Sequence, residues 1–238
     1  ILIDAGFSPC LSRRKNPCTA IKRVLKPQRR NPKHHAALPW ADLPAFYSAL
    51  INRHGVSPLA LRFVILTACR SREVREAKWG EIDGDVWIIP SNRTKTRRPH
   101  RVPLVPEALK VLEQVRGFDQ TYIFPSNVYK VPAGPRPLSV NAFRPLYERM
   151  GQTGLTTHGF RSTFRDWCSE YAEASREVAE AALAHALGEV ERAYRRSDLF
   201  ERRRLLMTSW SGFILHTDSR LVASLPVSEK EKNCFSNQ

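Results

Sequence analysis

The stretch from residue 59 to residue 69 constrains the fold most, because it is apolar on nearly every side of a helix. It follows Ser57, which can cap a helix, and Pro58, which suits the first helical position. Arg62 interrupts the stretch, which is also too short to cross a bilayer. The sequence therefore predicts a buried core helix in a globular domain, and other elements must cover it.

The rest of the chain shows mostly helical spacing, with one region that is typical of strands. Val, Ile and Trp are frequent at 85–90 and 100–104, which indicates an antiparallel hairpin around a polar, basic connection that contains Lys95. Residues 127–137 are rich in proline and read as a loop. The expected fold is mainly α with a small antiparallel β-sheet (α+β), with further helices near residues 43–50 and at 72–78, 106–116, 139–150, 157–171, 175–187, 189–196 and 198–215.

The length of 238 residues fits one main domain of roughly 150 to 200 residues with flanking segments. Apolar residues make up 42% and charged residues 26%, a mixture typical of folded domains. We expect a basic linker at 1–38, a catalytic domain at 39–215 and a polar tail at 216–238. The chain opens on Ile1 rather than on a methionine, so we expect a fragment or a processed chain.

The formal net charge of +15 predicts a polyanionic partner. Nucleic acid is favoured over an anionic membrane, because no apolar segment is long enough to span a bilayer and no signal peptide is visible. Between residues 11 and 40 there is no acid, and prolines interrupt any long helix. We interpret this part as an extended linker along a phosphate backbone, or alternatively as a solvated tail, with nine basic residues: Arg13, Arg14, Lys15, Lys22, Arg23, Lys26, Arg29, Arg30 and Lys33.

The five cysteines are odd in number, far apart and never in a Cys-x-x-Cys pair. This pattern favours a reducing cytoplasm and argues against a zinc site.

The segment from Thr157 to Tyr171 predicts a helix with two faces. Its aromatic residues fall at positions 160, 164, 167 and 171, which makes an apolar stripe that anchors the helix. His158, Arg161 and Arg165 share another face, where an imidazole beside a guanidinium can bind a phosphate. Taken alone, such a pattern is more often a solvated helix face.

Arg70 follows the predicted core helix, so the core would fix its position. Ser71 can cap the next helix, and Glu73 can orient a neighbouring arginine by hydrogen bonding. The alternative is an ordinary turn between helices with an exposed ion pair.

His185 and Tyr194 lie in the third segment of interest. Gly188 fits the end of the helix that carries His185, and Tyr194 follows among arginines that include Arg195 and Arg196. Positive neighbours favour the phenolate and attract a phosphate. The alternative is a tyrosine packed under its own helix.

The order of these residues resembles that of the tyrosine recombinases. The ordered set is Arg70, Lys95, His158, Arg161, His185 and Tyr194, within the sequences Leu-Thr-x-x-Arg-x-x-Glu, His-x-x-Arg and Leu-Ala-His. The motifs His-Arg-Val-Pro-Leu (100–104), His-Gly-Phe-Arg (158–161) and Ala-Tyr-Arg-Arg-Ser-Asp-Leu-Phe (193–200) are similar to those of prophage and genomic-island integrases related to that of phage P4. Such integrases begin with arm-binding and core-binding domains, so residues 1–38 would hold only a remnant of the latter.

The resemblance implies a DNA recombinase that forms a 3′-phosphotyrosyl intermediate without metal or cofactor. Arg70, Arg161, His158 and His185 would bind the phosphate, Tyr194 would attack it, Lys95 would protonate the leaving oxygen, and Glu73 would support Arg70. The implied partners are double-stranded attachment-site DNA, a homotetramer on that DNA and DNA-bending accessory proteins, in a bacterial cytoplasm. Beyond the linker, we expect DNA contacts from Arg93, Arg97, Arg98, Arg165, Arg195 and Arg196.

Two other functions stay open at this point. The chain could be a DNA-binding remnant of an integrase that no longer recombines, or a topoisomerase-like enzyme that relaxes DNA through the same phosphotyrosine step. A basic structural protein, such as a ribosomal component, would have no reason to order these six residues.

Overall fold

In the computed structural model, which describes residues 36–126, 134–185 and 197–216, the predicted core helix is α3 (Val56–Thr67). Its apolar side chains from residue 60 to residue 66 are at most 1% exposed. Arg62 is also buried, and it donates to Glu107 at 2.9 Å and to Gln114 at 3.0 Å. The one charge in the apolar run is thus satisfied by α5 (Pro106–Val115), the helix that packs on α3.

The start of α3 differs from the prediction. Gly55, not Ser57, is the residue before the helix, which begins at Val56. Gly55 has a φ of +111°, a conformation that glycine adopts readily and other residues rarely do. Pro58 is therefore the third helical residue, where its missing N–H removes no intrahelical hydrogen bond.

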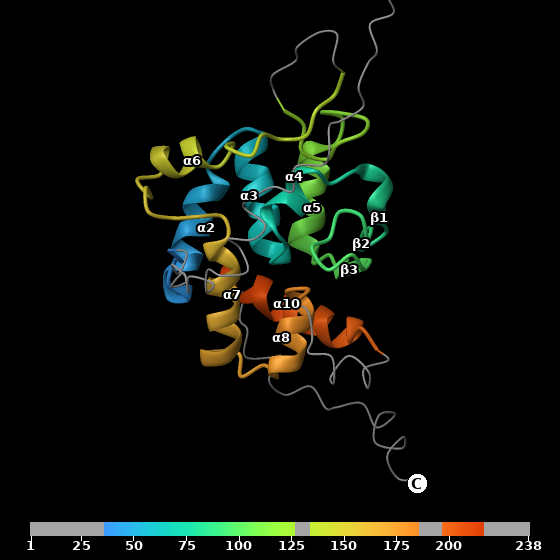
Figure 1. The fold of residues 1–238 in the computed structure, drawn as a ribbon. Helices are drawn as coiled ribbons and strands as arrows, with labels where there is room; N and C mark the ends of the chain where they lie inside the picture. The colour runs from blue at the N-terminus through green and yellow to red at the C-terminus, as the bar shows by residue number, and fades with distance from the viewer. Residues whose placement is uncertain (1–35, 127–133, 186–196, 217–238) are drawn as a thin grey trace, which may run out of the picture. The chain divides into compact units, whose positions relative to one another are not determined.

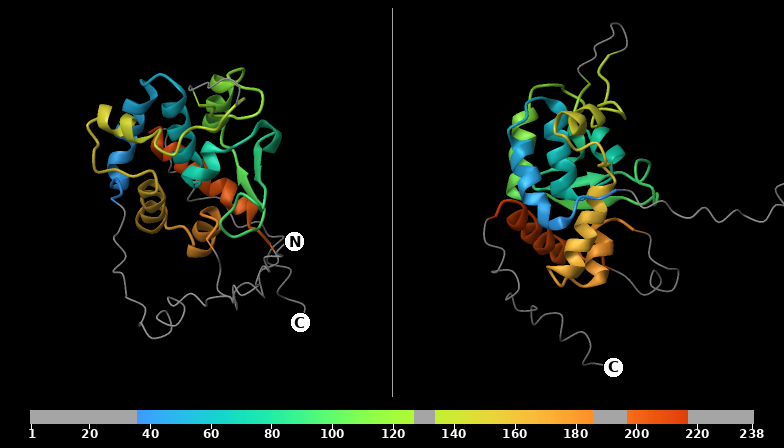
Figure 2. Two further views of the ribbon diagram at one scale, coloured as in Figure 1. Left: turned by 45° about the horizontal axis from the view of Figure 1, so that its top comes forward. Right: turned by 90° about the vertical axis from the view of Figure 1, so that its left-hand side faces the viewer.

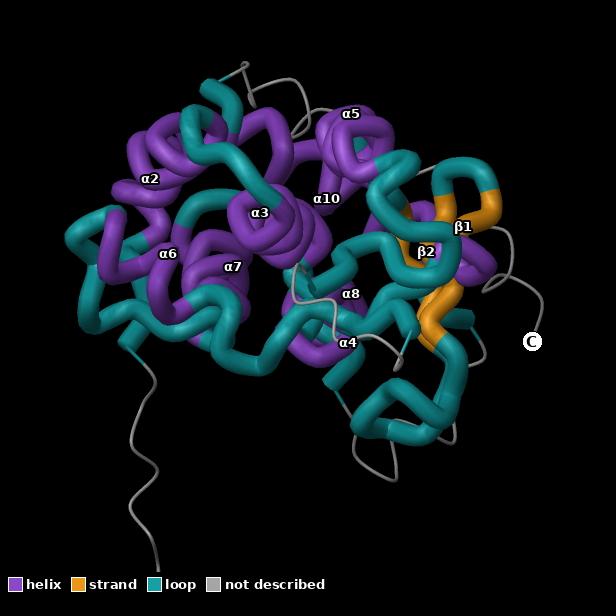
Figure 3. The backbone as a smooth tube through the Cα atoms, turned by 90° about the horizontal axis from the view of Figure 1, so that it is seen from above, coloured by secondary structure: helices purple, strands orange, loops and turns teal. Residues whose placement is uncertain are grey.

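Helices surround α3 on several sides (Figures 1 and 3). Figure 3 places α3 at the centre of the helical part and the strands at one edge of it. The short 3₁₀ turn Trp40–Asp42 leads into α2, close to the helix expected from Leu43, Phe46 and Leu50. The elements that contact α3 are α2 (Leu43–Ile51), α4 (Ser71–Arg75), α5, α7 (Gly159–Glu170) and α10 (Phe200–Ile214).

A small antiparallel sheet has the strand order β1-β2-β3. The predicted hairpin is formed by β2 (Val86–Ile89) and β3 (His100–Pro103), in a register that pairs Ile89 with His100. The sequence did not reveal β1 (Ile82–Asp83), whose two residues are too few for an alternating pattern. The mainly helical fold with a small sheet is confirmed.

The aromatic stripe of α7 forms the second part of the core. Phe164 and Trp167 are fully buried, and the Trp167 ring lies 4.8 Å from the ring of Trp210 in α10. Trp210 also donates to the carbonyl of Ile65 in α3 at 2.8 Å. The final helix therefore packs on its own domain, as Figure 2 shows for α10 across α7 and α8 (Arg176–Ala182).

Several predicted helix bounds were wrong. Helix α4 is Ser71–Arg75 rather than 72–78, and only Arg144–Arg149 (α6) of the segment 139–150 is helical. Helix α8 ends at Ala182, not at 187, and the expected helix at 189–196 lies outside the described residues. Throughout 36–126, 134–185 and 197–216, each helix is too short or too polar to cross a bilayer.

The early end of α8 has a local cause. Ala184 adopts a left-handed φ of +48°, and its N–H donates to the carbonyl of Ala181 at 3.1 Å. The N–H of His185 donates to the carbonyl of Glu180 at 3.0 Å. These two bonds form a Schellman C-cap with alanine where glycine is usual, so the sequence assigned the cap wrongly to Gly188.

Candidate active site

Arg70 lies between the end of α3 and the start of α4. Its backbone N–H donates to Oε2 of Glu73 at 2.8 Å, and its guanidinium donates to Oε1 at 2.9 Å. Glu73 is only 2% exposed. Arg70 itself, rather than Ser71, is the N-cap of α4, and both oxygens of Glu73 hold it there.

Arg161 projects from the first turn of α7 into the protein and is 4% exposed. Its guanidinium donates to the carbonyl of Ala68 at 2.5 Å and to the carbonyl of Leu183 at 2.6 Å. Burial, and then the nearby charge of Arg70, lowers the pKa of Arg161 to about 10, so it stays charged at neutral pH. The Arg161 guanidinium is therefore a buried cation that two carbonyls hold in place.

The end of α8 completes this cluster. The carbonyl of Ala184 accepts from Arg70 at 3.1 Å, next to the Leu183 carbonyl that accepts from Arg161. His185 follows, and its Nε2 lies 3.2 Å from the Arg161 guanidinium. The left-handed turn thus brings both arginines and His185 together, although Arg70 and His185 lie more than a hundred positions apart in sequence.

His185 has a second partner that sequence reasoning missed. Its Nδ1 lies 2.5 Å from Oε2 of Glu180, and Oε1 of Glu180 accepts from Nε of Arg165 at 2.7 Å. Burial raises the pKa of Glu180, but the hydrogen bonds from His185 and Arg165 outweigh it, so the net pKa is lowered. Arg165, which the sequence assigned to DNA, has an ion pair with this carboxylate.

His100 is a second residue that the sequence did not assign. Burial and the charges of Arg203, Arg70 and Arg161 lower its pKa to about 3, and it hydrogen bonds to the backbone of Ala182. His100 is therefore neutral at working pH and lies beside the two arginines of the site. Its motif was noted at 100–104, but nothing in the spacing indicated burial against α8.

Lys95 lies exposed in the connection between β2 and β3. The connection is held by Thr94, whose hydroxyl donates to the carbonyl of Arg98 at 2.8 Å. Arg93 points inward: it pairs with Glu81 at 2.5 Å and donates to the carbonyl of Glu73 at 3.2 Å. The connection is thereby tied to the residue that holds Arg70, while Arg97 and Arg98 are exposed with Lys95.

His158 is the residue before α7, and it is exposed. The next residue, Gly159, packs so closely on the backbone that an added Cβ would lie 2.2 Å from the carbonyl oxygen of Ala36. Thr163 also donates to the carbonyl of Leu38 at 2.6 Å. The chain that follows the basic linker therefore lies against the start of α7, beside His158.

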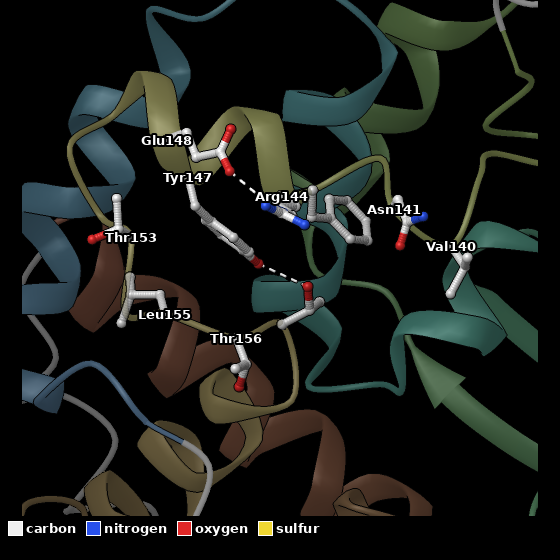
Figure 4. A pocket seen from close by; sticks show the side chains of 10 residues that line it. Val140, Asn141, Arg144, Tyr147, Glu148, Thr153, Leu155 and Thr156 are labelled. Carbon is white, nitrogen blue, oxygen red and sulfur yellow. Dashed lines mark hydrogen bonds and ion pairs between the residues drawn. The ribbon is translucent and has the colours of Figure 1, made fainter.

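A pocket of about 590 Å³ lies beside the segment that leads to His158 (Figure 4). Helix α6 supplies one side of it, where Arg144 donates to Glu148 at 3.0 Å. Tyr147 and Thr157 share a hydrogen bond of 2.8 Å, which joins α6 to this segment. The pocket lining contains none of the predicted site residues.

Several predicted residues lie outside the described ranges. They are Tyr194, Arg195, Arg196 and the nine basic residues of the linker. Within the part of the chain that the structure covers, no three His, Cys, Asp or Glu side chains gather as metal ligands would.

Comparisons with known proteins agree with the sequence motifs. The model of the phage integrase family matches residues 41–199. Prophage integrase IntZ of Escherichia coli K12 is 32% identical over 206 residues, which cover 84% of this chain and 50% of that protein. Prophage integrase IntA of the same strain is 37% identical over 161 residues, or 65% of this chain and 38% of that protein. The integrase of Enterobacteria phage P4 is 27% identical, over 84% of this chain and 50% of its own length.

Among solved structures, a lambda integrase dimer bound to a COC′ core site shares 19% identity with a TM-score of 0.46, over 68% of this chain and 58% of that one. The chain spans about half the length of the curated relative IntZ. The family model, which covers most of the catalytic region predicted from the sequence, is the basis of the assignment. The chain belongs to the phage integrase family, as its motifs predicted.

Proposed function

We propose that this chain is the catalytic part of a site-specific DNA recombinase that cleaves and rejoins DNA through a 3′-phosphotyrosyl intermediate. The observation that carries the proposal is the convergence of Arg70, Arg161 and His185 at the end of α8. Two guanidinium groups at one place suit a phosphodiester, because each can donate two hydrogen bonds to non-bridging oxygens. The net charge of +15 suits a long DNA partner.

The proposed reaction begins with neutralisation of the phosphate, whose negative charge repels nucleophiles. Arg70 and Arg161 stabilise the charge that develops on the non-bridging oxygens, and His185 donates a further hydrogen bond. The buried Glu73 keeps the Arg70 guanidinium in place. These groups supply the charge stabilisation for which other phosphoryl-transfer enzymes use magnesium.

In the same proposal, the phenolic oxygen of Tyr194 attacks phosphorus as His158 accepts its proton. The bond from phosphorus to the 5′-oxygen breaks, and Lys95 gives that oxygen a proton. The products are a 3′-phosphotyrosyl bond and a free 5′-hydroxyl. A 5′-hydroxyl from a second strand reverses the step, so no ATP is needed.

The proposed partners are double-stranded attachment-site DNA, three further copies of the chain in a tetramer on that DNA, and DNA-bending accessory proteins, all in the bacterial cytoplasm. The exposed cations Lys95, Arg97 and Arg98 are proposed to face the DNA backbone with the basic linker. Arg93 and Arg165 already have carboxylate partners, so we expect them to contribute less to DNA affinity.

A nicked suicide substrate tests the proposal, because the cleaved end diffuses away and traps the covalent intermediate. We expect the wild type to give a protein–DNA band that survives a denaturing gel, and Tyr194→Phe to bind the same DNA without this band. Binding without any adduct in the wild type would favour a DNA-binding remnant. Relaxation of a supercoiled plasmid with an adduct but no exchanged strands would favour a topoisomerase.

A further inference from the structure

Glu180 connects two elements of the candidate site through one carboxylate. One oxygen accepts from Nε of Arg165 on α7 at 2.7 Å, and the other lies 2.5 Å from Nδ1 of His185. Glu180 is the third residue from the end of α8, and its backbone carbonyl accepts the N–H of His185 at 3.0 Å. The backbone and the side chain of Glu180 thus both hold His185.

The carboxylate determines which ring nitrogen of His185 carries the proton. An ionised carboxylate only accepts hydrogen bonds, so Nδ1 must be the donor. The other nitrogen, Nε2, then faces Arg161 at 3.2 Å. As a neutral ring, His185 accepts from Arg161 at Nε2. As an imidazolium, it presents a second N–H to an anion bound by the same arginines.

The charges around His185 act in opposite directions. Arg161 and Arg70 disfavour a positive ring, since both contact the same turn. Glu73 offsets Arg70 through their ion pair of 2.9 Å. Glu180 favours the positive ring directly, while Arg165 weakens that effect by sharing the carboxylate. Of the described residues around the ring, Glu180 is therefore the one in contact that stabilises the imidazolium.

We propose that Glu180 is a positioning residue of the recombinase reaction: it fixes the Nδ1–H form of His185 and thereby the orientation of the ring toward the DNA phosphate. This inference rests on the proposed function. Arg165 holds the Glu180 carboxylate in its orientation, so its part in the site is indirect. In metal sites, carboxylate partners likewise fix the tautomer and the orientation of histidine ligands, and their loss costs roughly 10- to 100-fold in metal affinity or activity.

The test compares Glu180→Gln and Glu180→Ala with a control. Glutamine keeps an oxygen that can accept from Nδ1 but removes the negative charge, whereas alanine removes both. Glu113→Gln is the matched control, because Glu113 is an exposed residue of α5 and its loss changes the net charge equally. Single-turnover cleavage of the suicide substrate is measured for each variant, with DNA affinity measured separately.

We expect Glu180→Gln, which keeps an acceptor for Nδ1, to retain most of the wild-type cleavage rate. Glu180→Ala should be roughly 10- to 100-fold slower. Both should bind DNA like Glu113→Gln, and thermal melting should show that they fold. Cleavage by Glu180→Ala at the rate of Glu113→Gln would overturn the inference.

A measurement without DNA separates this inference from the proposed function. The tautomer of His185 is determined from side-chain ¹H–¹⁵N correlation spectra, with the His185→Gln variant used to assign its signals among the seven histidines. We expect a protonated Nδ1 in the wild type and in Glu180→Gln, and a loss of this preference in Glu180→Ala. A wild-type ring protonated only at Nε2 would contradict the inference even if the DNA is cleaved.

Discussion

Arg70 and Arg161 are held by the core, whereas Lys95 and His158 lie exposed on segments that border it. The two guanidinium groups donate to the carbonyls of Ala68, Leu183 and Ala184, so their positions depend on α3 and α8. Lys95 depends on the β2–β3 connection, which is tied to the core through its neighbour Arg93. The comparison indicates that this domain fixes the groups proposed to stabilise charge and leaves those proposed to transfer protons at the surface.

The largest expected effect concerns Arg161, one of the two arginines that the core holds. Arg161→Lys keeps the positive charge but loses the planar guanidinium. That group donates to two carbonyls and is proposed to donate to the phosphate as well. We expect cleavage to fall about 10²- to 10³-fold, the loss typical when one fixed donor is removed from a charge-stabilising site. Single-turnover cleavage on the suicide substrate measures this, well below the melting temperature of the variant.

The same variant should also be less stable, by about 2 kcal/mol, because the buried carbonyls of Ala68 and Leu183 lose their partners. Arg72→Lys is the control, since Arg72 is exposed on α4 and its side chain pairs with the neighbouring Glu76. Near wild-type cleavage by Arg161→Lys would show that the guanidinium of Arg161 is not needed for cleavage.

Lys95, one of the two exposed residues, should respond differently from Arg161 to a change of leaving group. Lys95→Ala is expected to slow cleavage about 10²-fold, since a general acid typically contributes 10²- to 10⁴-fold. On a substrate with sulfur in place of the 5′-bridging oxygen, the leaving group needs no proton, so the variant should return to within about tenfold of the wild type. Arg161→Lys should stay slow on both substrates. An equal defect of Lys95→Ala on both substrates would contradict the distinction between the core-held arginines and the exposed residues.

The lowered pKa of His100 predicts how the free energy of unfolding changes with pH. Its pKa of about 3 in the folded state lies below the value of about 6.5 for an unfolded histidine. Between these values the unfolded chain binds the extra proton, so the free energy of unfolding falls as the pH falls from 6.5 toward 3. The expected loss approaches about 1.4 kcal/mol per pH unit. Urea unfolding at pH 6.5 and 4.5 should show a shallower dependence for His100→Gln, and an equal dependence would contradict burial of this ring.

The smallest expected effect comes from the turn between α8 and His185. Ala184 has a φ of +48°, which costs an L-residue roughly 1 kcal/mol relative to glycine. Ala184→Gly should therefore stabilise the domain by about 1 kcal/mol in urea unfolding, with cleavage unchanged, because the hydrogen bond to Arg70 uses the backbone. A destabilised variant would show that the methyl group, rather than the turn, holds this end of the helix.

The sequence could predict the features that have a local signal or a family motif, and it missed those that depend on the folded domain. The α7 stripe and the core helix α3 were visible because periodic apolar side chains are a local signal. Arg70 and Arg161 were found through their order within family motifs. The end of α8 was wrong because Ala184 takes the left-handed position in which glycine is usual, so the sequence pointed to Gly188 instead. Glu180 and His100 were missed because the unexpected turn brings Glu180 to His185, and because His100 meets Ala182 only in the folded domain.

The central claim is that Arg70, Arg161 and His185 surround a single DNA phosphate. A crystal structure of the chain trapped on a suicide substrate tests it most directly, through the distances from the non-bridging oxygens of the scissile phosphate to these side chains. We predict guanidinium nitrogens of both arginines, and Nε2 of His185, at about 3 Å from those oxygens. A phosphate bound away from the end of α8, with either arginine out of hydrogen-bonding reach, would contradict the account.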